Sequence, residues 1–112
     1  MTQEIQEVNV TNSLRNVPFD HGFHFCIENG FTGVTAISLS EFSQKLNSID
    51  VNSVLFHYSS GDFQKWIEDT LGDKELANRM CFIKRDISGE KLRTQLLRIT
   101  QKRIKELQPA SF

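Results

Sequence analysis

The stretch from Asp50 to Asp73 constrains the fold most, because it stops and restarts helices twice by the same device. A glycine followed at once by an aspartate occurs at 61–62 and again at 72–73. The glycine can take the left-handed conformation that ends a helix, and the aspartate can accept the free backbone N–H groups that begin the next one. The stretch therefore predicts three short helices joined by tight turns, with Asp50, Asp62 and Asp73 as their N-caps.

The apolar residues of this stretch and its continuation recur at the spacing of one helix face. The three predicted faces consist of Val51, Val54, Leu55 and Tyr58, then Phe63, Trp66, Ile67 and Leu71, then Leu76, Ala77 and Met80. Connections this short force the helices to pack at steep angles. We expect Trp66 at the centre of that packing, in a structural core that also holds Phe25, Phe42, Phe63 and Ile67.

A β-hairpin is predicted upstream, within residues 22–37. Asn29-Gly30 is the strongest two-residue turn signal, because both central positions of a type I′ turn need positive φ. A lone hairpin is only marginally stable in water, so its apolar face must pack on the helices. The register that this turn predicts pairs Glu28 with Phe31, Ile27 with Thr32, Phe25 with Val34 and Phe23 with Ala36.

Two further helices complete the predicted fold. Ser38 begins the first with a capping box that ends at Glu41, and Ser88 caps a long last helix that runs to about Leu107. The main apolar stripe of the last helix is Leu92, Leu96, Ile99 and Leu107, with Leu97 and Ile104 to one side. We therefore predict an α+β fold, mostly α, in which an N-terminal two-stranded hairpin packs on four to five helices.

Residues 1–21 contain few apolar positions, and these do not recur with the period of a helix or a strand. We expect a flexible or loosely docked arm there, with an edge strand through Ile5, Val8 and Val10 as the alternative. Residues 22–112 are predicted to form a single domain, because a chain of 112 residues can bury one hydrophobic core but not two.

Composition argues against several classes of protein. No apolar run approaches about 18 residues, so no transmembrane helix is expected, and the polar, acidic start does not resemble a signal peptide. Cys26 and Cys81 stand far apart without motif spacing, which fits a reducing cytoplasm. His21, His24 and Cys26 lack the spacing of a zinc site, and no nucleotide-binding glycine pattern occurs. We therefore predict a cytoplasmic protein with no metal and no cofactor.

His57 is the nearest thing to a catalytic candidate, because histidine titrates near neutral pH and Asp62, Asp69 or Asp73 could pair with it. On a helical wheel, however, His57 falls off the apolar face of its helix. A general base needs a substrate pocket and an orienting partner, and the sequence shows neither. We expect His57 to make a structural hydrogen bond between turns, with a binding site and then catalysis as the alternatives, and we assign no catalytic residue.

Several motifs taken together resemble a prokaryotic, mainly archaeal family of uncharacterised domains. The matching positions are Ser38-Leu39, Phe42, Phe56-His57, Gly61-Asp62-Phe63, Trp66-Ile67, Leu71-Gly72-Asp73 and Leu76-Ala77. The resemblance covers roughly residues 23–80. It implies a short strand pair followed by short helices, and it carries no activity with it.

The net charge of −1 hides a polarity along the chain. Residues 1–76 carry 4 basic and 11 acidic residues, a net of −7, whereas residues 77–112 carry 9 basic and 3 acidic residues, a net of +6. At 100° per residue, Lys91, Arg98, Lys102 and Lys105 fall within about 60° of one another on the last helix. A solvated outer face is the ordinary interpretation of such a stripe, and binding of an acidic protein, another anion or RNA is the alternative.

Phe56 lies opposite Val51 and Leu55 on its predicted helix, so it is either buried by a second layer or part of an exposed patch for a partner. We hypothesise a non-enzymatic binding or adaptor domain that contacts a protein partner or a second copy of itself. The candidate contact residues are Phe56, His57, Lys91, Arg98, Lys102 and Lys105. The alternative is an RNA- or ribosome-associated protein that uses the basic last helix.

Overall fold

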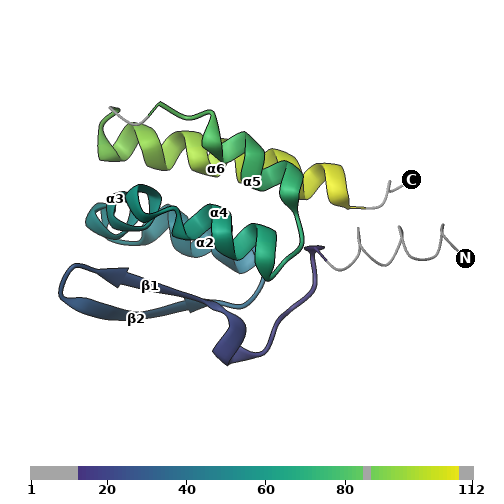
Figure 1. The fold of residues 1–112 in the computed structure, drawn as a ribbon, viewed down its shortest axis with the longest axis horizontal. Helices are drawn as coiled ribbons and strands as arrows, with labels where there is room; N and C mark the ends of the chain where they lie inside the picture. The colour runs from purple at the N-terminus through teal and green to yellow at the C-terminus, as the bar shows by residue number, and fades with distance from the viewer. Residues whose placement is uncertain (1–12, 85–86, 109–112) are drawn as a thin grey trace, which may run out of the picture.

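The computed structural model describes residues 13–84 and 87–108, which form three layers (Figure 1). The first layer is a hairpin of β1 (Phe23–Ile27) and β2 (Gly30–Ala36), the second holds α2 (Leu39–Ser48), α3 (Val51–Ser60) and α4 (Asp62–Asp69), and the third holds α5 (Lys74–Cys81) and α6 (Gly89–Leu107). The middle layer contacts both outer ones, through α2 and α3 against the hairpin and α6, and through α4 against α5. The predicted α+β class, mostly α with an N-terminal two-stranded hairpin, is confirmed.

The hairpin keeps the predicted register only in the half that lies away from its turn. Phe23 pairs with Ala36 and Phe25 with Val34, as expected, but nearer the turn Cys26 pairs with Phe31 and Ile27 with Gly30. The predicted pairs Glu28–Phe31 and Ile27–Thr32 are therefore wrong. A bulge between Phe25 and Cys26 takes up the difference.

The physical reason for this shift is a competing local interaction of Thr32. Among the described residues only glycines have positive φ, so Asn29 does not adopt the type I′ conformation and the expected turn does not form. Thr32 Oγ1 instead donates to the carbonyl oxygen of Phe25 at 2.7 Å and accepts from the N–H of Val34 at 3.2 Å. Together with Gly33, at φ +90°, this bonding stabilises the bulge at the expense of the tight turn.

Side-chain caps begin four of the helices. Oxygens of Ser38, Asp50, Asp73 and Ser88 accept backbone N–H groups at the starts of α2, α3, α5 and α6. The prediction for Asp62 is wrong: Gly61, at φ +73°, ends α3 and is also the N-cap position of α4, where no side chain caps the backbone. Asp62 is the first residue of α4, and its carboxylate binds His57 instead.

The predicted buried face of α3 is partly wrong. Val54 and Tyr58 are buried, but the other buried residues are Ser53 and His57, whereas Leu55 is exposed. Ser53 Oγ donates to the carbonyl oxygen of Cys26 at 2.7 Å, and His57 Nε2 accepts from the N–H of Cys26 at 2.7 Å. The backbone N–H and carbonyl groups of Cys26 on β1 thus find their hydrogen-bond partners on α3. This explains why Ser53 and His57 face the hairpin.

A cluster of aromatic rings fills the space between the hairpin and the middle layer. Phe25, Phe42 and Phe63 are completely buried, and the rings of Phe42 and Phe63 meet edge to face with their centroids 5.3 Å apart. Ile67 is also completely buried. Trp66 is buried but lies at the rim of the cluster, where its Nε1 donates to the carbonyl oxygen of His21 at 2.9 Å.

The described part of the N-terminal segment packs on the domain. Val17 is buried and its N–H donates to the carbonyl oxygen of Ile37, just after β2, at 2.8 Å. Arg15 Nη2 donates to the carbonyl oxygen of Thr70 at 2.8 Å. The rest of the predicted arm, including the possible edge strand through Ile5, Val8 and Val10, lies outside the described residues.

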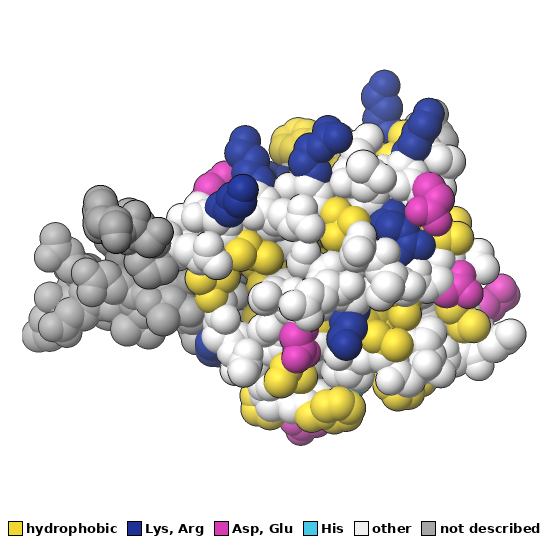
Figure 2. Space-filling view, turned by 180° about the vertical axis from the view of Figure 1, so that it is seen from behind, with side chains coloured by type: hydrophobic (Ala, Val, Ile, Leu, Met, Phe, Trp, Pro, Cys, Tyr) yellow, Lys and Arg dark blue, Asp and Glu magenta, His cyan; other side chains and the backbone are white. Residues whose placement is uncertain are grey.

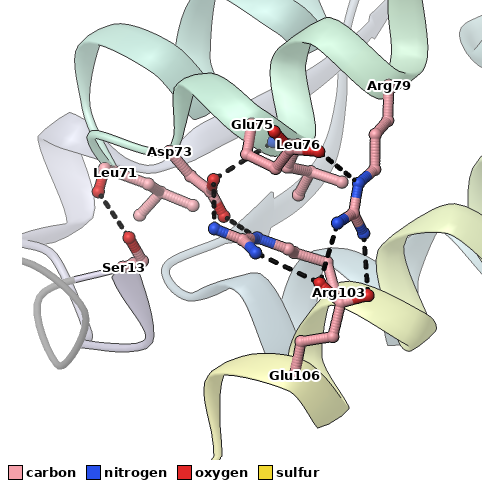
Figure 3. Close-up of polar contacts among 8 residues, drawn as sticks. All are labelled: Ser13, Leu71, Asp73, Glu75, Leu76, Arg79, Arg103 and Glu106. Atoms are coloured by element: carbon pink, nitrogen blue, oxygen red, sulfur yellow. Dashed lines mark hydrogen bonds and ion pairs between the residues drawn. The ribbon is translucent and has the colours of Figure 1, made fainter.

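A chain of ion pairs joins α5 to α6 (Figure 3). Asp73 is buried at the start of α5, where its carboxylate accepts from the N–H of Leu76 and from two nitrogens of Arg103, at 3.0 and 3.1 Å. Arg103 also reaches Glu106, which accepts two hydrogen bonds from Arg79. This network ties the side of α6 that carries Arg103 and Glu106 to α5.

Candidate functional site

The long helix α6 carries six basic residues, and the structure divides them into two groups. Arg93 and Arg103 turn toward the rest of the domain. Arg93 Nη1 donates to the carbonyl oxygen of Leu46 at 2.7 Å while Nε binds Glu90, and Arg103 binds Asp73 and Glu106. These two side chains hold α6 against its neighbours and are not available to a ligand.

The other four basic residues are those of the predicted stripe, Lys91, Arg98, Lys102 and Lys105. All four are exposed, and none makes an ion pair within the described part of the chain. Figure 2 shows Lys and Arg side chains gathered along the upper part of the molecule, at the level of α5 and α6 in Figure 1. The stripe predicted from the sequence therefore contains the cations of α6 that are unpaired among the described residues, and it leaves out the two that make internal contacts.

Three of these cations border a groove between α2 and α6. Arg98, Lys102 and Lys105 line it from α6, and Asn47 lines it from the end of α2. Its volume is about 840 Å³. Lys91 stands one turn of α6 before the groove and does not line it. The predicted stripe is therefore longer than the groove, along the axis of α6.

The floor of the groove is partly apolar. Leu97 and Ile104 line it and are half-buried against the core. They are the two residues that the sequence places beside the main stripe of α6, seven positions apart. A ligand in this groove would meet hydrocarbon below and positive charge along one side. Asn47 comes from a distant helix, and no sequence pattern indicates it.

Neither carboxylate of α6 neutralises the groove. Glu90 binds Arg93, and Glu106 binds Arg79 and Arg103. The hydrogen bonds from Arg79 are the largest cause that lowers the pKa of Glu106 below its ordinary value. In the same way, the hydrogen bond to Glu106 raises the pKa of Arg79. Glu106 is therefore held on the side of α5 and Glu90 is paired with Arg93, so no carboxylate lines the groove among the described residues.

His57 forms a different arrangement, with both ring nitrogens engaged. Its Nε2 lies 2.7 Å from the backbone nitrogen of Cys26, and its Nδ1 lies 2.8 Å from Oδ2 of Asp62. A backbone N–H can only donate, so Nε2 must be the unprotonated acceptor and Nδ1 must carry the proton that is donated to Asp62. The imidazole thus links β1, α3 and the first residue of α4.

This bonding leaves His57 no nitrogen for proton transfer to a substrate. The ring is buried and makes an edge contact with Phe23 at a centroid distance of 4.7 Å. A hollow of about 350 Å³ lies beside it, bordered by Asp62, Lys65 and Trp66. Accepting a proton from a substrate would break the bond to Cys26, which holds the hairpin in place. The geometry supports the predicted structural hydrogen bond between turns.

Phe56 lies in a third place, beside the tip of the hairpin. It is 38% exposed and borders a groove of about 680 Å³ together with Leu55 and Ile27. Of the two alternatives left by the sequence, the structure therefore gives the exposed one. The remaining lining residues are polar or acidic, among them Glu28 and Asn52. This groove lies apart from the basic one, and the two have no described lining residue in common.

No group of three or more His, Cys, Asp or Glu residues within 13–84 and 87–108 is arranged to hold a metal ion. His24, one of the residues considered for zinc, binds Thr35 Oγ1 across the hairpin at 2.9 Å. Cys26 and Cys81 are both free thiols. None of the described helices combines the length and the apolar composition needed to cross a membrane.

No protein-family model, curated protein or solved structure matches the chain. The candidate site is therefore identified from the contacts in the structure alone. The resemblance to a prokaryotic family of uncharacterised domains therefore stays a prediction. The groove between α2 and α6 combines three cations, unpaired within the described residues, with an apolar floor, and it is the candidate for function.

Proposed function

We propose that this protein is a non-enzymatic binding domain that holds an acidic segment of a partner protein in the groove between α2 and α6. The observation that carries the proposal is the division of α6. Arg93 and Arg103 are consumed by internal contacts, whereas Arg98, Lys102 and Lys105 stand unpaired, within the described residues, beside Leu97 and Ile104. Three cations beside an apolar floor suit a ligand that offers both carboxylates and hydrocarbon.

The composition of the groove favours a protein over a nucleic acid. Single-stranded nucleic acid is held mainly by aromatic side chains that stack on bases and by cations along the backbone. Among the described residues, no aromatic side chain lines the groove. Leu97 and Ile104 offer aliphatic surface, which suits aliphatic or aromatic side chains of a protein ligand. The two free thiols agree with the predicted cytoplasmic location of such a domain.

A pair of matched variants tests the proposal. The groove variant carries Arg98→Glu, Lys102→Glu and Lys105→Glu. The control variant carries Lys65→Glu, Lys74→Glu and Lys84→Glu, which change the net charge equally at exposed positions outside the groove. Each protein is immobilised, and the proteins that it captures from nuclease-treated native extract are identified by mass spectrometry. We expect the wild type and the control variant to capture the same proteins and the groove variant to lose them.

RNA binding by the same cations is the second candidate, favoured by the four exposed basic residues of α6. Salt separates it from the first. Three phosphate contacts to a single strand would make log K fall with log salt at a slope of about −2. A protein ligand with an apolar centre should respond more weakly, mostly through its association rate. Capture that disappears on nuclease treatment would replace the proposed function with this one.

A further inference from the structure

The residues that line the groove from α6 follow a coiled-coil spacing. Thr94, Leu97, Gln101, Ile104 and Gln108 are separated by three, four, three and four positions, and all five border the groove. This alternation is that of the a and d positions of a heptad, with Leu97 and Ile104 at d. The helix from Thr94 to Leu107 spans two full heptads, about 21 Å, and Gln108 follows it as the C-cap residue with extended backbone.

This seam is distinct from the one that α6 uses for its own core. The side of α6 that packs against the rest of the domain carries four buried residues, Leu92, Leu96, Thr100 and Leu107. The predicted stripe had Ile99 in place of Thr100, but Ile99 is only half-buried. The seam of Thr94, Leu97, Gln101, Ile104 and Gln108 therefore lies next to the core seam. Its two apolar members are half-covered by the domain, and its polar members are exposed.

Two of the three cations flank the second seam. Arg98 and Lys105 each follow a d position directly and so stand at e, whereas Lys102 follows Gln101 and stands at b, farther from the seam. In coiled coils the residues at e and g pair across the interface and select the partner and its orientation. A helix lying along this seam would therefore be selected for acidic residues on its matching flank.

We infer that the groove takes an amphipathic α-helix of a partner protein, packed lengthwise on α6, with a leucine-type apolar stripe and acidic flanking residues. This inference rests on the proposed function and adds the conformation of the ligand. A second copy of this chain is not the occupant through the same seam. Two α6 helices in contact there would bring the cations at e, Arg98 and Lys105, of the two copies together without an opposing carboxylate among the described lining residues.

The polar a positions add a feature to the expected complex. Thr94, Gln101 and Gln108 replace the apolar residues that a permanent coiled coil carries at a. A polar residue at a fixes the register of the pair and lowers its stability. With only two apolar d residues in two heptads, the structure suits a helix that binds reversibly and in one register.

The probes are fluorescent peptides of about three heptads. The heptad peptide has Leu at a and d and Glu at the flanking positions, whose mutual repulsion keeps it from pairing with itself. The scrambled peptide has the same composition without the stripe. The charge-swapped peptide has Lys in place of every flanking Glu. Binding is measured by fluorescence anisotropy, and helix formation by the far-ultraviolet circular dichroism of the mixture minus that of its components.

Wild type should bind the heptad peptide with a gain of helical signal, and should bind the scrambled peptide at least about tenfold more weakly. The control variant should behave like the wild type. The groove variant should bind the heptad peptide at least about tenfold more weakly, because the attractive charge pairs of Arg98 and Lys105 become repulsive, and should now prefer the charge-swapped peptide. The comparison of heptad and scrambled peptides uses the wild type alone, so it decides the question even if the groove variant fails to fold.

Three outcomes overturn the inference, and they separate it from the proposed function. Equal binding of the heptad and scrambled peptides, or binding without a gain of helical signal, would mean that the groove recognises charge and not a helix. In that case the proposed function would still stand if only the groove variant lost protein capture. Absence of heptad-peptide binding also rejects the helical ligand. If the groove variant in addition captures the same proteins as the wild type, the proposed function fails as well.

Discussion

The two sides of α6 carry the same kinds of residue and use them in opposite ways. On the side of α5, Arg103 forms two hydrogen bonds with the buried carboxylate of Asp73, and Glu106 bridges Arg103 and Arg79. On the side of α2, Arg98, Lys102 and Lys105 face a groove without an ion pair among the described residues. Lys102 and Arg103 are adjacent in sequence. The environment therefore decides whether a cation stabilises the fold or stays available to a ligand.

The difference has an energetic consequence. A buried ion pair cannot lose one member without leaving the other charge poorly compensated, whereas an exposed cation without a partner can be changed at little cost to stability. Stability and binding should therefore respond to mutation on opposite sides of the same helix. The predictions below test this separation, from the largest expected effect on stability to the smallest.

The largest effect is expected for Asp73→Ala. The side chain of Asp73 is 1% exposed and that of Arg103 is 19% exposed, so removing the carboxylate leaves a mostly buried guanidinium without its main partner and the first turn of α5 without its cap. We expect a loss of about 3–5 kcal/mol in the free energy of unfolding, measured by urea denaturation. Asp73→Asn, which keeps an oxygen for the cap, should lose less. Equal losses would show that the charge and not the cap is responsible.

His57→Ala should have the next largest effect, at the junction between the hairpin and the middle layer. The variant leaves the N–H of Cys26 without its acceptor and creates a cavity beside Phe23. These two effects together should cost about 2–4 kcal/mol. The control is His24→Ala. His24 is half-buried on β1, the strand that contains Cys26, and its side chain makes one hydrogen bond. A loss no larger than that of the control would remove His57 from the structural role given to it.

Glu106→Gln tests the paired side of α6 through its pH dependence. The folded state lowers the pKa of Glu106, chiefly through hydrogen bonds from Arg79, so the folded chain binds the proton more weakly than the unfolded chain. The stabilisation is therefore present above the unfolded pKa of about 4.3 and is lost as the pH falls through the lower, folded value. The variant should be less stable than the wild type near neutral pH, and the difference should shrink as the pH falls below about 4. A difference that is constant with pH would contradict this assignment.

Local signals of the sequence predicted much of this architecture. Ser38, Asp50, Asp73 and Ser88 stand at helix starts because capping depends on residues within one turn, and the sequence contains that information. The same holds for the basic stripe, because helical periodicity alone separates Lys102 from Arg103. The alternation of apolar residues beside the stripe is also visible in the sequence, although its coiled-coil spacing gains meaning only once the groove is known.

The errors arose where a distant or competing partner decides the conformation. Thr32 binds across the hairpin and displaces the Asn29-Gly30 turn. His57 is buried because Cys26, 31 positions earlier, presents a backbone N–H to it, and Asp62 serves His57 and not the helix start. No pattern along the chain shows that Asn47 closes the groove from α2. These contacts depend on tertiary packing, which periodicity does not encode.

The smallest effect on stability is expected for the groove variant. It is the most direct test of the difference between the two sides of α6. Arg98, Lys102 and Lys105 are exposed and have no ion pair to lose within the described residues. Each substitution should therefore change the free energy of unfolding by no more than about 0.5 kcal/mol, as is usual for exposed positions away from special features. Urea denaturation of the single variants and of the triple variant measures this directly.

The meaning of that result depends on binding measured in the same proteins. Unchanged stability with loss of protein capture would show that these cations are kept for a ligand, since they contribute nothing to the fold. Unchanged stability with unchanged capture would make the stripe a solvated surface, and the groove beside Phe56 and Leu55 would become the next surface to test. A loss of stability as large as that of Asp73→Ala would erase the distinction between the two sides of α6. The comparison with Asp73→Ala is thus the internal standard, because both changes alter charge on or against the same helix and differ in whether a buried partner is left behind.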